Sequence, residues 1–234
     1  MNDTLIDRVA WIGAPNTTPR GIVLTFVGLG STGMKDTPSE QEQRWIDSGA
    51  LVVQPYYGPW SWMNDATVEF VDELVDGLRW RYGLGADTPL IATGGSMGGF
   101  AVLAYAMATT LGVTACFANC PVCDLPFHYT ERPDLPRTMH HAFGSYGDIT
   151  ATLEAHSPLH QPDRLPDVPY LIVHGTEDKS VGKARHSDPL VAAMVALKRN
   201  VEYIAVPGMG HCGPLPDALV AKIDAFVVEQ LGAI

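Results

Sequence analysis

Basic residues are scarce in this sequence, with 15 lysines and arginines against 26 aspartates and glutamates and a formal net charge of −11. A surface of that sign repels phosphate backbones and anionic lipids, so nucleic-acid and membrane partners are disfavoured. Cysteine is also scarce, because four cysteines in 234 residues do not make a disulfide-held scaffold. No apolar run reaches the roughly 20 residues that a membrane-spanning helix needs.

Signals for export and for several separate units are missing as well. The segment from Met1 to Thr4 lacks the basic and apolar regions of a secretory signal. No repeat, low-complexity tract or linker-like change of composition interrupts the chain. Hydrophobic residues make up 46% of it and charged residues 18%, which permits a large core. We therefore expect a cytoplasmic protein whose residues 1–234 form one domain.

Apolar runs of β type alternate with amphipathic or apolar helical stretches along the chain. This alternation predicts an α/β fold, in which helices cover both faces of a mostly parallel sheet. Strands are expected at residues 21–27, 50–54, 89–93, 113–119, 170–174 and 201–206, and the first 20 residues can add one or two edge strands.

Capping residues mark where several helices begin. Thr37-Pro38-Ser39-Glu40 has the pattern of a capping box, Asn64 or Asp65 can cap a long helix, and a closing helix is expected from about Pro216. Residues 120–168 differ from the rest, since they hold seven prolines and only short helical stretches. We expect them to form an irregular insertion or small cap over the sheet edge.

The segment Gly94-Gly95-Ser96-Met97-Gly98 matches G-x-S-x-G between a predicted strand and an Ala-rich predicted helix. In that setting the serine lies on a tight turn that lifts its hydroxyl above the sheet. Gly94 and Gly98 suit a turn in which strand and helix nearly touch. The turn also directs the Met97 N–H at a substrate oxygen. Ser96 is the candidate nucleophile; the alternative is a turn that only eases packing.

A serine hydroxyl is a weak nucleophile until a base takes its proton, and an acid must orient that base. In the strand-turn-helix arrangement above, the chain order is serine, then Asp or Glu, then histidine. Asp178 follows one predicted strand, and His211 follows the last one on a glycine-rich loop. Glu177 and Asp124 are the alternatives to Asp178. The other seven histidines lack a late strand-loop-helix position.

Two further segments are candidates for shaping the site. The loop after the 21–27 strand is rich in small residues, and the Leu29 N–H is the second candidate oxyanion donor, unless this is an ordinary loop. Four aromatic residues follow the 50–54 strand and can either line an acyl or aromatic pocket or pack the loop against the body. They are Tyr56, Tyr57, Trp60 and Trp62.

The pair Cys120 and Cys123 has C-x-x-C spacing, but a zinc site needs about four ligands and no second pair is present. We therefore expect no metal and interpret these two as structural thiols. Cys212 follows His211 directly, which predicts a position near the active site.

These motifs together resemble those of single-domain α/β-hydrolases related to the catalytic domain of the prolyl oligopeptidase family and to dienelactone-hydrolase-like esterases. The resemblance runs from about Gly21 to the C-terminus. Its most specific parts are Gly94 to Gly99, Ser157-Pro158-Leu159 with Tyr170 to Asp178, and Gly208 to His211. It implies an α/β-hydrolase fold without cofactor, with Ser96, Asp178 and His211 as the triad and with Met97 and the Gly28–Gly30 loop as oxyanion donors.

The sequence also departs from these relatives. Val27-Gly28-Leu29-Gly30 stands where many have His-Gly-Gly, no propeller domain is present, and Ser96 replaces the cysteine of dienelactone hydrolases. We expect a carboxylesterase that acts on small or medium acyl esters, with a small-molecule ester as its partner. The alternatives are a peptidase for short peptides or aminoacyl amides, and a non-catalytic receptor on the same fold.

Overall fold

The computed structural model describes residue 1 and residues 3–232, and these residues form seven strands in one sheet of order β1-β3-β2-β4-β5-β6-β7. Only β1 pairs antiparallel, with β3, and every other neighbouring pair is parallel. The expected α/β fold with a mostly parallel sheet is therefore confirmed. The strands are β1 (Ala10–Gly13), β2 (Gly21–Phe26), β3 (Ala50–Pro55), β4 (Leu90–Gly95), β5 (Ala115–Asn119), β6 (Tyr170–Gly175) and β7 (Val201–Val206).

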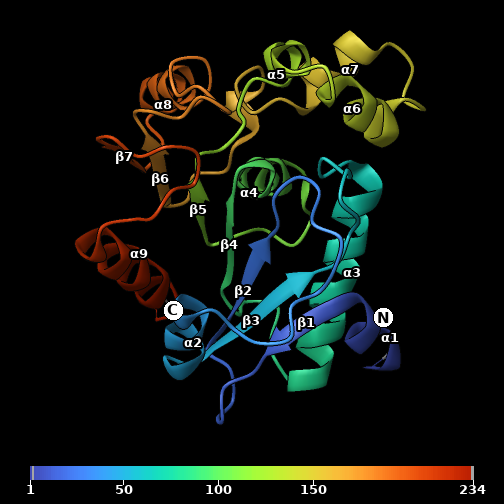
Figure 1. The fold of residues 1–234 in the computed structure, drawn as a ribbon. Coiled ribbons are helices and arrows are strands. Elements are labelled where there is room, and N and C mark those ends of the chain that lie inside the picture. Colours follow the sequence, from blue (N-terminus) through green and yellow to red (C-terminus); the bar gives the residue numbers. More distant parts are fainter. Residues whose placement is uncertain (2, 233–234) are drawn as a thin grey trace.

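Helices cover both faces of the sheet (Figure 1). The described helices are α1 (Asp3–Val9), α2 (Glu40–Asp47), α3 (Asp65–Tyr82), α4 (Met97–Ala108), α5 (Leu125–Glu131), α6 (Leu135–Phe143), α7 (Ile149–His156), α8 (Ser187–Ala196) and α9 (Asp217–Gln230), with a short 3₁₀ helix at Pro162–Arg164. None of them is long and apolar enough to cross a bilayer.

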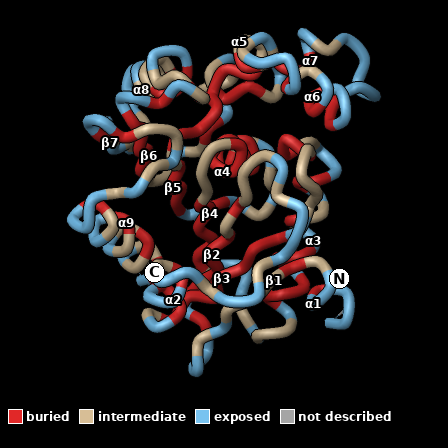
Figure 2. The backbone as a smooth tube through the Cα atoms, in the orientation of Figure 1, coloured by how far each residue is buried: buried red, intermediate tan, exposed pale blue. Residues whose placement is uncertain are grey.

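The core divides into two apolar clusters, one on each face of the sheet, and Figure 2 shows the central strands as the buried centre of the molecule. Alternation along a strand sends successive side chains to opposite faces. Leu24 accordingly belongs to the cluster that includes residues of α1, α3, α4 and α8, whereas its neighbour Val23 belongs to the cluster that includes residues of α2 and α9. Because both faces are buried, the strands are continuous apolar runs.

The beginnings of the helices test the capping predictions. Asn64 caps α3, since its Oδ1 accepts a hydrogen bond from the Thr67 N–H at 3.1 Å. The capping box of α2 was expected to start at Thr37 but starts two residues later. Its N-cap is Ser39, whose Oγ accepts from the Glu42 N–H at 3.3 Å, while the Glu42 carboxylate accepts the Ser39 N–H at 2.8 Å.

Residues 120–168 contain α5, α6 and α7, which lie above the carboxyl ends of the strands on the α4 side (Figure 1). Their apolar residues, among them Leu125, Met139 and Phe143, join the cluster of that face. The insertion is thus built from short helices rather than from irregular chain, and it covers part of the carboxyl edge of the sheet.

Candidate active site

Ser96 lies between the end of β4 and the first residue of α4, at the carboxyl edge of the sheet. Its backbone has φ 59° and ψ −125°, a strained conformation that non-glycine residues seldom adopt. The Ser96 N–H is held by the Asn119 carbonyl at 2.9 Å. This turn presents the hydroxyl above the sheet beside the N-terminus of α4, where the helix dipole favours negative charge.

The glycines on either side of Ser96 are required by close backbone contacts. A Cβ at Gly94 would lie 2.5 Å from the Gly98 carbonyl oxygen, and a Cβ at Gly98 would lie 2.3 Å from the Phe26 carbonyl oxygen. Real Cβ atoms do not approach a backbone atom so closely. The strand and the helix therefore nearly touch, as the motif predicts.

The loops after β6 and β7 bring Asp178 and His211 to the serine. His211 Nε2 lies 2.8 Å from Ser96 Oγ, and His211 Nδ1 lies 2.7 Å from Asp178 Oδ2. Because the carboxylate only accepts, Nδ1 carries the proton of the neutral imidazole and Nε2 offers its lone pair to the serine hydroxyl. The three predicted residues thus form one hydrogen-bonded chain in the order needed to activate a serine.

Asp178 is held rigidly in this chain. Its other oxygen, Oδ1, accepts the N–H groups of Ser180 and Val181, both at 2.9 Å. Burial alone raises the pKa of this carboxyl, but hydrogen bonds from His174, His211 and the Val181 N–H hold the pKa well below its usual value. In turn, the hydrogen bond to Asp178 outweighs burial and raises the pKa of His211. Asp178 is therefore ionised at neutral pH and stabilises a protonated His211.

The alternative acids have other positions. Asp124 caps α5, where its Oδ1 accepts the Phe127 N–H at 3.0 Å, and Glu177 is exposed. His174 is fully buried, with Nδ1 2.7 Å from Ser187 Oγ and Nε2 2.8 Å from the Val181 carbonyl oxygen. His174 Nε2 also lies 3.3 Å from Asp178 Oδ2, so His174 packs behind the acid rather than taking the place of the base.

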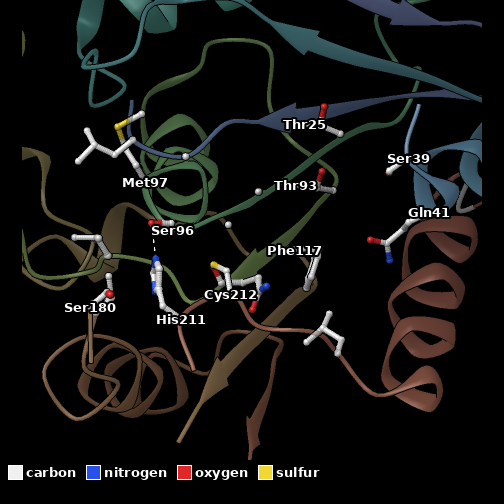
Figure 3. Close-up of a pocket in the computed structure, with 18 of the residues that line it drawn as sticks. Thr25, Ser39, Gln41, Thr93, Ser96, Met97, Phe117, Ser180, His211 and Cys212 are labelled. Atoms are coloured by element: carbon white, nitrogen blue, oxygen red, sulfur yellow. Dashed lines mark hydrogen bonds between the residues drawn. The ribbon is translucent and has the colours of Figure 1, made fainter. Parts of the chain in front are cut away.

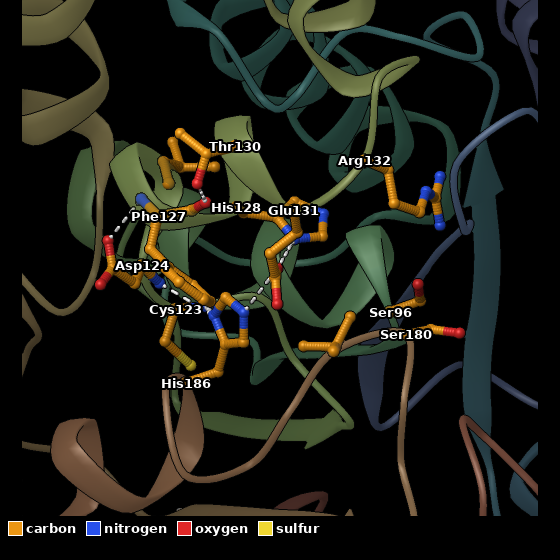
Figure 4. Close-up of polar contacts among 12 residues, drawn as sticks. Ser96, Cys123, Asp124, Phe127, His128, Thr130, Glu131, Arg132, Ser180 and His186 are labelled. Carbon is orange, nitrogen blue, oxygen red and sulfur yellow. Dashed lines mark hydrogen bonds and ion pairs between the residues drawn. The ribbon is translucent and has the colours of Figure 1, made fainter.

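His128, Glu131 and His186 form a second polar cluster, between α5 of the 120–168 insertion and the start of α8 (Figure 4). Glu131 Oε2 lies 2.5 Å from His128 Nδ1 and 3.1 Å from His186 Nε2. His186 Nδ1 accepts the N–H groups of Cys123 and Asp124 at 3.1 and 3.2 Å, so its proton is on Nε2. Glu131 thus links α5 to the loop before α8 and holds this part of the 120–168 insertion in place above Ser96.

The candidate oxyanion donors border the same cavity as Ser96. Met97 and Leu29 both line it, and no hydrogen bond among the described residues uses the Leu29 N–H. The preceding Val27 N–H donates to Tyr57 Oη at 3.0 Å. Tyr57 therefore holds the oxyanion loop, a role that sequence reasoning missed because it depends on a contact between loops 30 residues apart.

The cavity at Ser96 measures about 590 Å³, a size typical of small-molecule sites. Figure 3 shows the dashed contact between Ser96 and His211 at one end, and Thr25, Thr93 and Phe117 farther along. Cys212, which is exposed, also lines it.

The four predicted pocket aromatics do not share one wall. Trp62 lines the Ser96 cavity and is buried, with its Nε1 donating to Thr138 Oγ1 of α6 at 2.9 Å. Tyr56, Tyr57 and Trp60 instead line a separate pocket of about 420 Å³. The chain adopts positive φ at Trp62, 46°, and this turn separates Trp62 from the residues before it. Of the four, Trp62 is therefore the one that the structure places beside Ser96, and the other three are closer to the alternative in which they pack the loop against the body.

Metal-ligating side chains gather at three places among the described residues, each group having its ligand atoms within 4.8 Å of one another. Two of these groups include His211 or Asp178, whose atoms are engaged in the chain to Ser96. The third is the His128 cluster, where the Glu131 carboxylate already accepts from both histidines. Cys120 and Cys123 are buried free thiols. Each group thus contains side-chain atoms that are already engaged in hydrogen bonds within the protein.

The chain was compared with known protein families and with solved structures. A model of the prolyl oligopeptidase family matches residues 65–233. Comparison with curated proteins gives no match.

Solved structures of peptidases and esterases share the fold. A puromycin-hydrolyzing peptidase of Mycobacterium tuberculosis has a TM-score of 0.74 and 22% identity over 95% of this chain and 37% of its own. The esterase PE8 has a TM-score of 0.64 and 18% identity over 95% of this chain and 98% of its own. A truncated carbohydrate esterase from gut microbiota has a TM-score of 0.74 and 15% identity over 95% of this chain and 90% of its own. The chain spans 37% of that peptidase and nearly all of the two esterases.

Proposed function

This chain belongs to the prolyl oligopeptidase family and is a serine hydrolase, and from that premise we propose that it is a carboxylesterase for small to medium acyl esters. The observation that carries the proposal is the hydrogen-bonded chain from Ser96 through His211 to Asp178, with distances of 2.8 and 2.7 Å, at one end of a cavity of about 590 Å³.

The proposed reaction begins with attack of Ser96 Oγ on the ester carbonyl carbon, while His211 Nε2 takes the hydroxyl proton. The carbonyl electron pair moves onto its oxygen, which the N–H groups of Met97 and Leu29 stabilise. As the carbonyl re-forms, the C–O bond to the alcohol breaks and His211 returns the proton to the departing oxygen. Water, deprotonated by His211, then attacks the acyl carbon, the bond from that carbon to Ser96 Oγ breaks, and His211 returns the proton to Oγ as the acid leaves. Ionised Asp178 holds the imidazole throughout.

The charges around the cavity support an ester over a peptide substrate. Anchoring a peptide N-terminus requires an acidic group facing the site. Among the described residues that line the cavity, the only carboxylate is Glu42, and it is paired with Lys35 and bonded to Ser39. An ester with an uncharged alcohol needs no such anchor.

A small peptidase or aminoacyl-amide hydrolase is the second candidate, and one observation favours it. The family model that matches residues 65–233 is that of the prolyl oligopeptidase family, and a puromycin-hydrolyzing peptidase is among the solved structures that share the fold.

Hydrolysis rates on two substrate panels would test the proposal: p-nitrophenyl esters from acetate to octanoate with an aryl ester, and aminoacyl anilides. Wild type is measured beside Ser96→Ala. We expect ester turnover that disappears in the variant, with anilides inert. Anilide cleavage of comparable efficiency would instead identify a peptidase, and silence on both panels would favour the receptor alternative.

A cytoplasmic location, a small-molecule ester as partner and the lack of nucleic-acid and membrane partners belong to the same proposal. They rest on the formal net charge of −11 and on the composition.

A further inference from the structure

The Ser96 cavity extends away from the triad along the sheet face that carries α2 and α9. Its floor is a row of three neighbouring side chains on β2, β4 and β5. Thr25 pairs in register with Thr93, and Thr93 pairs with Phe117, so the three point to the same face. Trp45 of α2 and Leu215, just before α9, line the same extension. We call this part of the cavity the α2–α9 arm, defined by Thr25, Trp45, Thr93, Phe117 and Leu215. Figure 3 shows Thr25, Thr93 and Phe117 of this set.

The polar atoms of the arm are engaged with neighbouring chain. Thr25 Oγ1 donates to the Val53 carbonyl at 3.3 Å, and Thr93 Oγ1 donates to the Leu24 carbonyl at 2.9 Å. Each threonine therefore has a methyl group left to contact a ligand. Trp45 Nε1 donates to Asp224 of α9 at 2.9 Å, so the part of its largely buried ring that borders the cavity is apolar. The arm can offer methyl groups, two aromatic rings and a leucine, with no free charge among these five residues.

Two features keep the arm open and joined to the nucleophile. Asp224 binds α2 to α9, since it accepts from Gln41 Nε2 at 3.1 Å and from Arg44 Nε at 2.6 Å as well as from Trp45. The helices are thus fixed by their own contacts rather than by filling the space near Thr25. At the junction, Gly94 and Gly95 line the cavity between Ser96 and Thr93 and carry no side chain to narrow it.

We propose that the α2–α9 arm binds an unbranched hydrocarbon chain of the ester substrate while the ester carbonyl lies at Ser96. This assignment rests on the proposed esterase function and adds the substrate class to it. The apolar groups of these five residues and their continuity with Ser96 fit a linear alkyl chain, and the polar residues beside them are engaged, Glu42 with Ser39 and Gln41 with Asp224. The chain belongs to either the acyl or the alcohol part of the ester, and the two are separated by experiment.

The experiment measures kcat/KM for two substrate series, p-nitrophenyl esters of C2 to C10 acids and acetate esters of C2 to C10 alcohols. Each methylene that enters apolar surroundings should raise kcat/KM about fourfold until the arm is full. A rise in the first series assigns the arm to the acyl part, and a rise in the second assigns it to the alcohol.

Variants of the arm make the assignment specific. Thr25→Met fills the arm, and we expect the ratio of kcat/KM for the C8 and C2 substrates to fall by roughly tenfold, the value of one to two methylenes. Thr25→Val, which keeps the shape, is the matched control and should keep the wild-type ratio. Leu215→Trp fills the arm from the opposite loop, so the test survives if one variant fails to fold, as judged by thermal melting.

The outcomes separate this inference from the proposed function. Suppose that p-nitrophenyl acetate is hydrolysed in a Ser96-dependent way but that neither series depends on chain length. The assignment of the arm to an alkyl chain would then be wrong, whereas the esterase proposal would stand. A wild-type rise that persists in both filling variants would also overturn it, because the chain would then bind elsewhere. If no ester is hydrolysed in a Ser96-dependent way, both the proposed function and the assignment of the arm are wrong.

Discussion

Two groups of loops lie at the same edge of the sheet but hold their side chains in different ways. The first group follows β4, β6 and β7, and the second is the single loop that follows β3. In the first group, each functional side chain sits within a few residues of a strand end and is held by hydrogen bonds, as Ser96, Asp178 and His211 are. In the loop after β3, aromatic rings point in two directions. Trp62 is buried and donates to Thr138 of α6, whereas Trp60 packs against the exposed His141 of the same helix.

This difference reflects two ways of placing a side chain. A residue at the end of a strand inherits its position from the sheet, so its direction follows from local sequence. A residue in a longer loop takes its direction from whichever distant segment packs against it. The first arrangement suits groups that must meet within hydrogen-bond distance, and the second determines the walls of the pockets.

The largest effect should come from breaking the hydrogen-bonded group. Ser96→Ala should lower kcat by roughly 10⁶ if the three residues act as a unit, and Asp178→Asn by about 10⁴ because the imidazole loses its correct tautomer. Steady-state kinetics on p-nitrophenyl acetate would measure both. A mild effect of Asp178→Asn would move the acid to Glu177 or Asp124.

The next prediction concerns the backbone that supports Ser96. Gly98→Ala places a Cβ 2.3 Å from the Phe26 carbonyl oxygen, so the turn must shift. We expect kcat to fall on the order of 10²-fold and the free energy of unfolding to fall by about 1–3 kcal/mol. Gly182→Ala is the control, because a Cβ there meets nothing within 4 Å. Equal stability of the two variants would contradict the close contact of strand and helix.

The pH profile should report the ion pair within the group. His211 must be neutral to accept a proton, so kcat/KM should fall as pH drops below its pKa, about tenfold per pH unit. Asp178 raises the pKa of His211 above its ordinary value, so this acid limb should lie above pH 6.5. In Asp178→Asn the limb should move to lower pH. An unmoved limb would mean that another group controls it.

Much of the active-site chemistry, and less of the cavity, could be predicted from sequence. The strands, the turn at Ser96 and the loops of Asp178 and His211 follow from local patterns, because sheet order then brings the strand ends together. The start of α2 was misplaced because Thr37 and Ser39 are both capable caps, each followed by a glutamate three residues later, and in the folded chain the Ser39–Glu42 pair forms the box.

The cavity walls could not be predicted in the same way. They depend on contacts between distant segments, such as Trp62 with α6 and the α2–α9 link at Asp224. The helices of the 120–168 insertion likewise gain stability from the apolar cluster that they join, which their short proline-rich segments do not reveal.

Tyr57 tests whether the loop after β3 supports catalysis from outside the cavity. Tyr57→Phe removes the acceptor of the Val27 N–H, and an unpaired buried donor costs about 1–3 kcal/mol. If part of that cost reaches the oxyanion loop, kcat should fall several-fold while KM stays nearly constant. A change confined to KM would instead place Tyr57 against the substrate.

The smallest effect is expected at Trp60, which lines the second pocket and stacks on the Arg137 guanidinium. Trp60→Ala should change kcat/KM on all esters by less than about twofold, since surface changes away from a site are nearly neutral. A loss that grows with acyl-chain length would return this residue to the substrate pocket and weaken the contrast between the two regions.

The central claim, that His211 activates Ser96, is tested most directly by labelling folded protein with a fluorophosphonate and locating the adduct by mass spectrometry. We predict one adduct per chain, on Ser96, formed far more slowly in His211→Ala and absent in Ser96→Ala. No adduct in folded wild type, an adduct on another residue, or equal labelling of His211→Ala would contradict it.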